Sequence, residues 1–186
     1  IPDENHAVEQ SYRQARAMDA PQAEYPGASR FAPAHSGNYR TVATQRTIDR
    51  IVIHITDGGS RISGTIGWFQ NPDQRNSRNE HITVSAHYVI GRDGEVVQMV
   101  RHNDVAWHAS SANSHSIGIE HVANKRGLDP TEEEYQASSR LVAWLCAQYG
   151  IPVSDGAATD NVDEAVAIAD RIGYPVVIKA QVQVGG

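Results

Sequence analysis

The sequence predicts an α/β domain, because short β-branched runs and one long amphipathic helical pattern occur in the same chain. Three segments carry this prediction: an apolar run at residues 51–56, a hairpin pattern over residues 83–100 and helical periodicity over residues 131–149. A chain of 186 residues suits one domain with extensions, and such a domain buries roughly 70% of its unfolded surface. We therefore expect a conventional hydrophobic core, with no disulfide or metal required for folding.

The run at residues 51–56, IVIHIT, is typical of a buried strand, and the Asp-Gly-Gly that follows it is typical of a turn. His54 is its one titratable side chain. Alternation places Val52, His54 and Thr56 on one face of the strand and the three isoleucines on the other. A core histidine that bonds a neighbour and a functional histidine that faces a site both fit this pattern.

The next elements are a helix and a hairpin. A short helix is expected over residues 63–71, and strands at residues 83–90 and 95–100 are joined by the turn sequence GRDG. The segment VAWHA, at residues 105–109, reads as a loop that holds an aromatic side chain beside a histidine. These elements give the domain its middle portion.

A last strand and a long helix follow. Residues 116–122 form a strand that directs Glu120 to one face and Ile117, Ile119 and His121 to the other. The helix over residues 131–149 begins after Asp-Pro, has three glutamates in its first turn, and ends before Gly150 and Pro152.

Composition limits the class of protein. The formal charge of -6 and the pI near 5.8 argue against a nucleic-acid partner or an anionic membrane surface, since both require a basic face. No apolar run is long enough to span a bilayer. The lone Cys146 leaves the redox compartment open, and a first residue other than Met leaves secretion open as well.

Residues 1–30 are polar and are expected to form an N-terminal arm with a helix near residues 3–18.

Five segments occur in the order found in one enzyme family: IVIHIT, SAHYVIGRDGEVVQMV, VAWHAS, SIGIEHV and the helix at residues 131–149. Residues 31–153 thus resemble the zinc-dependent N-acetylmuramoyl-L-alanine amidases related to peptidoglycan recognition proteins and to amidase-type phage lysozymes. The resemblance implies a mixed, twisted β-sheet flanked by helices and a groove for a peptidoglycan glycan-peptide strand. It also implies hydrolysis of the amide between N-acetylmuramic acid and L-alanine, in a parent protein that is secreted or acts in the cell envelope.

The resemblance also assigns roles to individual residues. His54 matches the first zinc-binding histidine, Tyr88 the active-site tyrosine, and Glu120 the general base, while Trp107 and His108 are expected to form a substrate-binding groove wall. A catalytic zinc takes three protein ligands and one water, a carboxylate can move that water's proton, and a phenol can bond an oxyanion. Each residue also has an ordinary structural interpretation, as a strand or loop side chain.

The zinc site is incomplete by this comparison. Family members place a second histidine and then a cysteine or aspartate after the long helix, but here no histidine or cysteine follows Cys146. The candidates for replacement ligands, none at a recognisable spacing, are His87, His108, His115, His121, Asp155 and Asp160.

Residues 154–186 resemble a different family. They are similar to an ATP-grasp segment of the succinyl-CoA synthetase β-subunit, in which the residue matching Lys179 helps to bind ATP phosphates and glycines from Gly185 open a loop. The remainder of an ATP-grasp domain is absent from this sequence, so ATP binding is not expected. The pattern predicts a helix followed by a strand at residues 176–184, whose open edge would permit a dimer.

We interpret the chain as a chimera joined near residues 149–153, with the foreign helix and strand as replacement packing. Three functional hypotheses follow. The first is a zinc amidase that acts on peptidoglycan, and the second is a metal-free module that binds peptidoglycan without cleaving it. The third is an engineered chimera in which neither activity was required.

Overall fold

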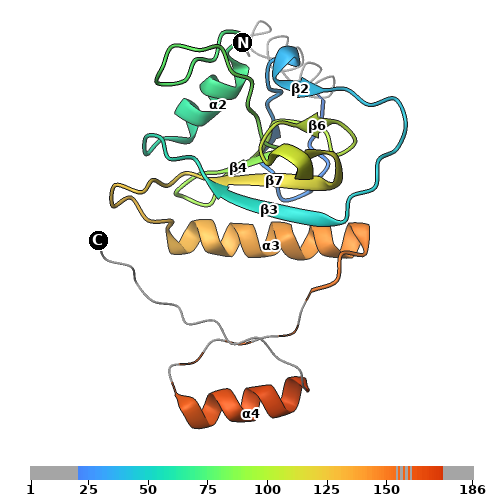
Figure 1. Ribbon diagram of the computed structural model, residues 1–186, viewed down its shortest axis with the longest axis vertical. Coiled ribbons are helices and arrows are strands. Elements are labelled where there is room, and N and C mark those ends of the chain that lie inside the picture. The colour runs from blue at the N-terminus through green and yellow to red at the C-terminus, as the bar shows by residue number, and fades with distance from the viewer. Residues whose placement is uncertain (1–20, 154, 156, 158, 160, 174–186) are drawn as a thin grey trace, which may run out of the picture. The chain divides into compact units, whose positions relative to one another are not determined.

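The computed structural model describes residues 21–153, 155, 157, 159 and 161–173 (Figure 1). The helix expected near residues 3–18, Asp160, Lys179 and the strand expected at residues 176–184 lie outside the described residues, as does the dimer contact proposed for that strand. The chain divides into one unit at Ile1–Ile151 and a second at Pro152–Gly186, and each is described by itself.

The first unit is built on a five-stranded mixed sheet with the order β1-β5-β4-β7-β3. Its strands are β1 at Arg30–Phe31, β3 at Arg50–Ile55, β4 at Tyr88–Ile90, β5 at Val96–Gln98 and β7 at Ser116–His121. Strands β4 and β5 pair antiparallel, as the hairpin pattern predicts, and the other pairs are parallel. A separate antiparallel pair joins β2 at Tyr39–Arg40 to β6 at Val105–Ala106.

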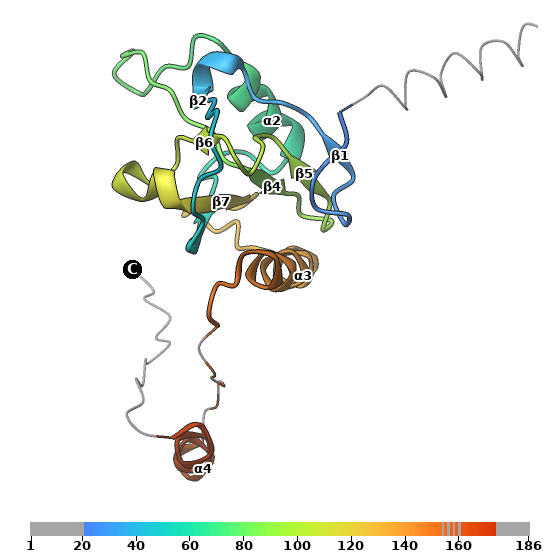
Figure 2. The same cartoon turned by 90° about the vertical axis from the view of Figure 1, so that its right-hand side faces the viewer.

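Helices lie on both sides of this sheet (Figures 1 and 2). Helix α2 spans Ile62–Gln70 and packs through Ile66 and Phe69 against Val89, Val97 and Met99. Helix α3 spans Glu132–Tyr149 and packs through Ala137, Leu141 and Leu145 against Tyr88, Ile90, Ile117 and Ile119. The two faces of the sheet therefore belong to two separate hydrophobic clusters, which confirms the predicted mixed sheet between helices.

Helix α3 begins as its sequence predicts. Thr131 and Glu134 form a capping box, in which the Thr131 side chain accepts from the Glu134 N–H and the Glu134 carboxylate accepts from the Thr131 N–H. Gly150 ends the helix in the left-handed conformation, at φ +64°.

The prediction that residues 51–56 form a buried strand is wrong in one respect. Strand β3 exists, but it is the last strand of the sheet, and its Ile53 and Ile55 side chains are 54% and 37% exposed. They border a shallow groove of about 560 Å³ together with Pro130, Tyr135 and Val142. An apolar run indicates a strand but does not reveal whether a further element covers its outer side.

Residues 21–30 differ from the polar arm that the sequence suggests. Tyr25 is buried in the α3-side cluster, and the Glu24 carboxylate accepts from the His102 N–H at 2.8 Å. Strand β1 pairs with β5. This described part of the N-terminal segment is consequently an integral edge of the domain.

The second unit contains helix α4 at Val162–Ile172. Asn161 caps its N-terminus by accepting from the Glu164 N–H, and Asp163 and Glu164 occupy the first turn. These signals confirm the helix that the tail sequence predicts.

Candidate active site

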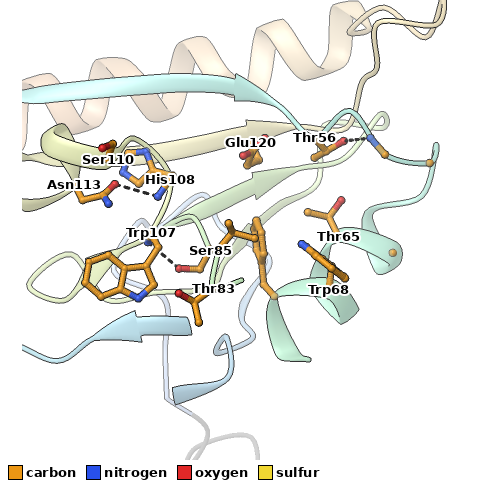
Figure 3. Close-up of a pocket in the computed structure, with 15 residues that line it drawn as sticks. Thr56, Thr65, Trp68, Thr83, Ser85, Trp107, His108, Ser110, Asn113 and Glu120 are labelled. Carbon is orange, nitrogen blue, oxygen red and sulfur yellow. Dashed lines mark hydrogen bonds between the residues drawn. The ribbon is translucent and has the colours of Figure 1, made fainter. Parts of the chain in front are cut away.

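A pocket of about 840 Å³ opens on the α2 side of the sheet (Figure 3). It is bounded by helix α2, the segment before β4, the loop after β6 and the end of β7. Its lining residues are Thr56, Gly58, Gly59, Gly64, Thr65, Trp68, Phe69, Thr83, Val84, Ser85, Trp107, His108, Ser110, Asn113 and Glu120. Figure 3 shows Trp68 on α2 and Trp107 on the loop, with Glu120 on β7. The pocket thus combines aromatic surface and hydroxyl groups with a single carboxylate.

Glu120 is the acidic group of this pocket. It lies in register with His54 of β3 and with Val89 of β4, so these three side chains share one face of the sheet. Burial raises the pKa of the Glu120 carboxyl to about 7, and its Oε2 atom is buried without a hydrogen-bond partner in the described structure. Near neutral pH this carboxyl therefore exchanges readily between its acidic and basic forms.

A chain of hydrogen bonds connects His54 to Ser116. His54 Nε2 lies 3.1 Å from His108 Nδ1, and His108 Nε2 lies 3.2 Å from the Ser116 hydroxyl. The single Ser116 proton is donated to the Ala112 carbonyl at 2.7 Å, so Ser116 accepts from His108 Nε2–H. His108 Nδ1 then accepts from His54 Nε2–H. Burial lowers the pKa of both histidines, which keeps both rings neutral near pH 7.

Gly118 allows the His108 ring to occupy its position. A Cβ atom at residue 118 would lie 2.6 Å from the nearest ring carbon of His108, so a larger residue would displace the ring. The Gly118 N–H donates to His87 Nδ1 at 3.0 Å, and the opposite ring nitrogen of His87 donates to the Asp104 carbonyl at 3.1 Å. Both nitrogens of His87 therefore have backbone partners, and Nε2 also lies 2.9 Å from the Arg46 guanidinium.

Two further residues fix the loop that carries Trp107 and His108. The Asn113 side-chain oxygen accepts from the N–H groups of His108 and Ala109, at 3.0 and 2.6 Å. The Arg46 guanidinium donates to the carbonyls of His102, Asn113 and Ser116, at 2.7, 3.1 and 2.9 Å. Burial lowers the pKa of Arg46 to about 10. Neither residue was predicted from the sequence, because neither lies in a motif: Asn113 accepts from backbone N–H groups, and the partners of Arg46 are more than 40 residues away.

The family model described as N-acetylmuramoyl-L-alanine amidase matches residues 44–169. The chain belongs to this amidase family. The match includes His54, Glu120, the pocket loop and helix α3, and it continues past residue 153 into α4. The resemblance inferred from the sequence motifs is therefore confirmed.

Individual relatives agree with this assignment. The chain is 37% identical to N-acetylmuramoyl-L-alanine amidase A of Achromobacter lyticus over 129 residues, which are 67% of this chain and 65% of that protein. The chain thus spans slightly less than two thirds of this relative.

Solved structures show the same fold. A selenomethionine derivative of AmpD matches with a TM-score of 0.54 at 23% identity, covering 80% of this chain and 98% of AmpD. A mutant of PlyL matches with a TM-score of 0.50 at 20% identity, covering 66% of this chain and 76% of that chain.

The second resemblance is confirmed as well. The β-subunit of the ADP-forming succinate–CoA ligase of Natronomonas pharaonis is 57% identical over 53 residues, which are 28% of this chain but 13% of the subunit. An alignment of 53 residues is longer than the tail that begins at residue 154, so this likeness includes residues before the tail. The ligase likeness therefore overlaps the amidase match at residues 44–169, and the presence of both likenesses fits a chimera. No helix among the described residues is long and apolar enough to cross a membrane.

Tyr88, the expected active-site tyrosine, does not reach the pocket. It lies in register with Ile119, on the face of the sheet that α3 covers, and it is fully buried there. Its hydroxyl lies 2.5 Å from His102 Nε2, and His102 Nδ1 lies 2.6 Å from the Tyr149 hydroxyl. Burial raises the pKa of the Tyr88 phenol. The motif was read correctly as a strand, but alternation directs this side chain away from Glu120.

The remaining site predictions differ in outcome. Trp107 and His108 both line the pocket, whereas His54 lines the shallow groove beside β3 and contacts His108. Of the proposed replacement ligands, His87 has both ring nitrogens bonded, His115 is exposed, and His121 borders the groove on the α3 side. Asp155 belongs to the second unit.

A three-ligand zinc site does not fit the described residues. Within them, no group of three or more histidine, cysteine, aspartate or glutamate side chains is arranged to hold a metal ion. His54 and His108 are the two imidazoles brought into direct contact on the pocket side. Catalytic zinc sites ordinarily have three protein ligands.

Proposed function

We propose that this chain hydrolyses the amide between N-acetylmuramic acid and L-alanine in peptidoglycan. One observation supports this above the others: a member of the amidase family keeps a buried glutamate, Glu120, with an unpartnered oxygen at a large pocket. A carboxyl with a pKa of about 7 can both accept and return a proton at neutral pH. The partner under this proposal is a glycan-peptide strand, and the protein acts where peptidoglycan is found.

Glu120 serves as the general base in this proposal. Its carboxylate takes a proton from water as the water oxygen attacks the amide carbonyl carbon. The protonated carboxyl then gives that proton to the leaving nitrogen of L-alanine. The products are a free lactyl carboxylate on the sugar and a peptide with a free amine.

The pocket walls account for binding. Trp68 and Trp107 offer flat apolar surfaces that suit sugar rings and the lactyl methyl group, and Thr65, Thr83 and Ser85 offer hydroxyls for polar groups. Zinc dependence also belongs to this proposal, with His54 as one ligand by family resemblance. Because the described residues do not supply a three-ligand site, none of the steps assigned to Glu120 is routed through a metal.

A metal-free peptidoglycan-binding module is the second candidate. It is favoured by the combination of a well-formed pocket with the absence of a three-ligand group among the described residues. Under this alternative the aromatic walls would hold the glycan-peptide strand without cleavage.

Digestion of purified peptidoglycan tests the proposal. The wild type, a Glu120→Gln variant and a Glu80→Gln control at an exposed position are incubated with peptidoglycan in the presence of added zinc, and released peptides are identified by mass spectrometry. We expect stem peptides with a free L-alanine amine from the wild type and the control. Glu120→Gln should release them at a rate at least about 100-fold lower than that of the wild type.

Two outcomes contradict the proposal. Equal rates for Glu120→Gln and wild type would remove Glu120 from the reaction. Co-sedimentation of the wild type with peptidoglycan, without peptide release, would establish the binding module instead.

A further inference from the structure

Asn113 offers the pocket a hydrogen-bond donor that the protein itself does not use. Its side chain is 9% exposed and lines the pocket. The Oδ1 atom accepts from the N–H groups of His108 and Ala109, at 3.0 and 2.6 Å. Two donors to one atom identify that atom as the amide oxygen, so the other terminal atom is Nδ2. Nδ2 forms no hydrogen bond within the described part of the chain and is therefore free to donate to a ligand.

The position of this donor is fixed from two directions. The bonds to the backbone of His108 and Ala109 set the plane of the side-chain amide, and Arg46 donates to the Asn113 backbone carbonyl at 3.1 Å. A donor that is already ordered loses little rotamer entropy when it binds a ligand. Nδ2 is consequently preorganised for an acceptor in the pocket.

Asn113 and Trp107 lie at one end of the pocket. Figure 3 shows both on the same side of Glu120, with Thr65 and Trp68 on the opposite side. The order of the chain agrees, because Asn113 precedes β7 and Glu120 lies near the end of that strand. A substrate whose amide is hydrolysed at Glu120 therefore places one half against Trp107 and the other against Trp68.

The Trp107 end suits an N-acetylated sugar. The indole of Trp107 is half-buried and can pack against the C–H groups of a sugar ring. An acetamido carbonyl is a neutral acceptor, as the NH₂ group of Asn113 requires. Among the described residues, those that line the pocket include no lysine or arginine, so a neutral acceptor is favoured over the carboxylates of a stem peptide.

We propose that Asn113 Nδ2 donates a hydrogen bond to the acetamido carbonyl of N-acetylmuramic acid, with the sugar ring packed on Trp107. The stem peptide then extends past Glu120 toward Trp68. Asn113 is on this basis a specificity-determining residue, because a sugar with a free 2-amine has no carbonyl at that point. The inference rests on the proposed function, from which it takes its substrate.

Binding of two small muropeptides provides the first test. N-acetylmuramoyl-L-alanyl-D-isoglutamine and its analogue with a free 2-amine are titrated calorimetrically into the full chain with Glu120→Gln. This background slows cleavage and removes a charge that could attract the amine. We expect the acetylated ligand to bind about 10-fold more tightly, which corresponds to one hydrogen bond in a pocket open to water.

An Asn113→Asp variant in the same background separates recognition from folding. It keeps an acceptor for the two backbone N–H groups but loses the donor, so the preference for the acetylated ligand should vanish or reverse. The control Asn79→Asp makes the same change of charge at an exposed position and should keep the preference. Thermal unfolding establishes that each variant is folded. Equal loss of affinity for both ligands in Asn113→Asp would overturn the proposal.

Nitrogen-15 NMR of the Asn113 side chain supplies a readout that requires no substitution at this position. Its Nδ2 resonance should shift with the acetylated muropeptide and not with L-alanyl-D-isoglutamine alone. A shift of the same size with the dipeptide, equal affinity for the acetylated and free-amine ligands, or no binding of the acetylated ligand would each overturn the proposal. If wild-type protein binds with the expected preference but releases no peptide, the proposed hydrolysis fails and the role of Asn113 stands.

Discussion

Two chains of side-chain hydrogen bonds, each centred on a histidine, lie on opposite faces of the same sheet. They differ in whether the last ring nitrogen has a hydrogen-bond partner. On the α3 side, His102 joins the hydroxyls of Tyr88 and Tyr149, so both of its ring nitrogens have partners inside the domain. On the α2 side, the chain from Ser116 through His108 ends at His54, where the second ring nitrogen has no protein partner in the described structure. The first chain is closed and the second is open.

We interpret this difference as the one between structural polar groups and candidate functional ones. His102 is 3% exposed and its bonds stabilise the packing of the N-terminal segment and α3 on the sheet. The open chain instead lies beside a pocket that also contains the unpartnered Glu120 oxygen. Residue type alone does not distinguish the two, since both contain histidine; the partners at each end do.

The largest expected effect on stability comes from removing His102, the centre of the hydrogen-bond chain on the α3 side. A His102→Ala substitution would leave the buried Tyr88 phenol and the half-buried Tyr149 phenol without their partner and create a cavity, so the free energy of unfolding should fall by about 4 kcal/mol. Denaturant unfolding of this variant beside His115→Ala measures the difference. A loss below about 1 kcal/mol would mean that the hydrogen bonds of His102 contribute little to the stability of the fold.

A second, smaller effect concerns Glu120 and pH. Because burial raises its pKa from 4.5 to about 7, the native state binds more protons than the unfolded chain within that interval. The stability contributed by the protonated group is complete below pH 4.5 and is lost as pH rises through 7, by about 3 kcal/mol in total.

Unfolding measurements at a series of pH values isolate this contribution. The wild type should lose stability relative to Glu120→Gln between pH 4.5 and 7, while contributions from the histidines cancel in the difference. A constant difference across that range would show that Glu120 titrates normally.

The smallest effect is expected from Tyr88→Phe. Removing the hydroxyl leaves one nitrogen of His102 without its partner, so stability should fall by about 2 kcal/mol. The rate of peptide release should be unchanged, because Tyr88 lies on the face away from the pocket. Slower peptide release at unchanged stability would indicate that Tyr88 takes part in the reaction. The two faces of the sheet would then not differ in function.

Local patterns in the sequence predicted most of the elements. Alternation and turn residues located β3, β7 and the β4–β5 hairpin, and the Asp-Pro sequence followed by three glutamates located the start of α3. Alternation also separated His54 from the isoleucines of β3, and Glu120 from Ile117 and Ile119 of β7. These properties depend on neighbours in the sequence, and a single chain contains that information.

The errors concern long-range partners. Nothing local shows that β3 lies at the edge of the sheet, so its isoleucines were expected to be buried. The role suggested for Tyr88 followed a family motif and not the alternation that directs the side chain toward α3. The contact between His54 and His108 joins residues 54 positions apart, and spacing along the chain could not predict it.

Arg46 has a consequence for any shortened version of this protein. Its guanidinium links two backbone carbonyls from the segment between β5 and β7 to the carbonyl of Ser116, the first residue of β7, although Arg46 itself precedes β3. A truncation that starts at the first residue of β3 would keep the whole pocket sequence but would remove this donor. The smallest fragment that retains a properly shaped pocket must therefore begin upstream of residue 46.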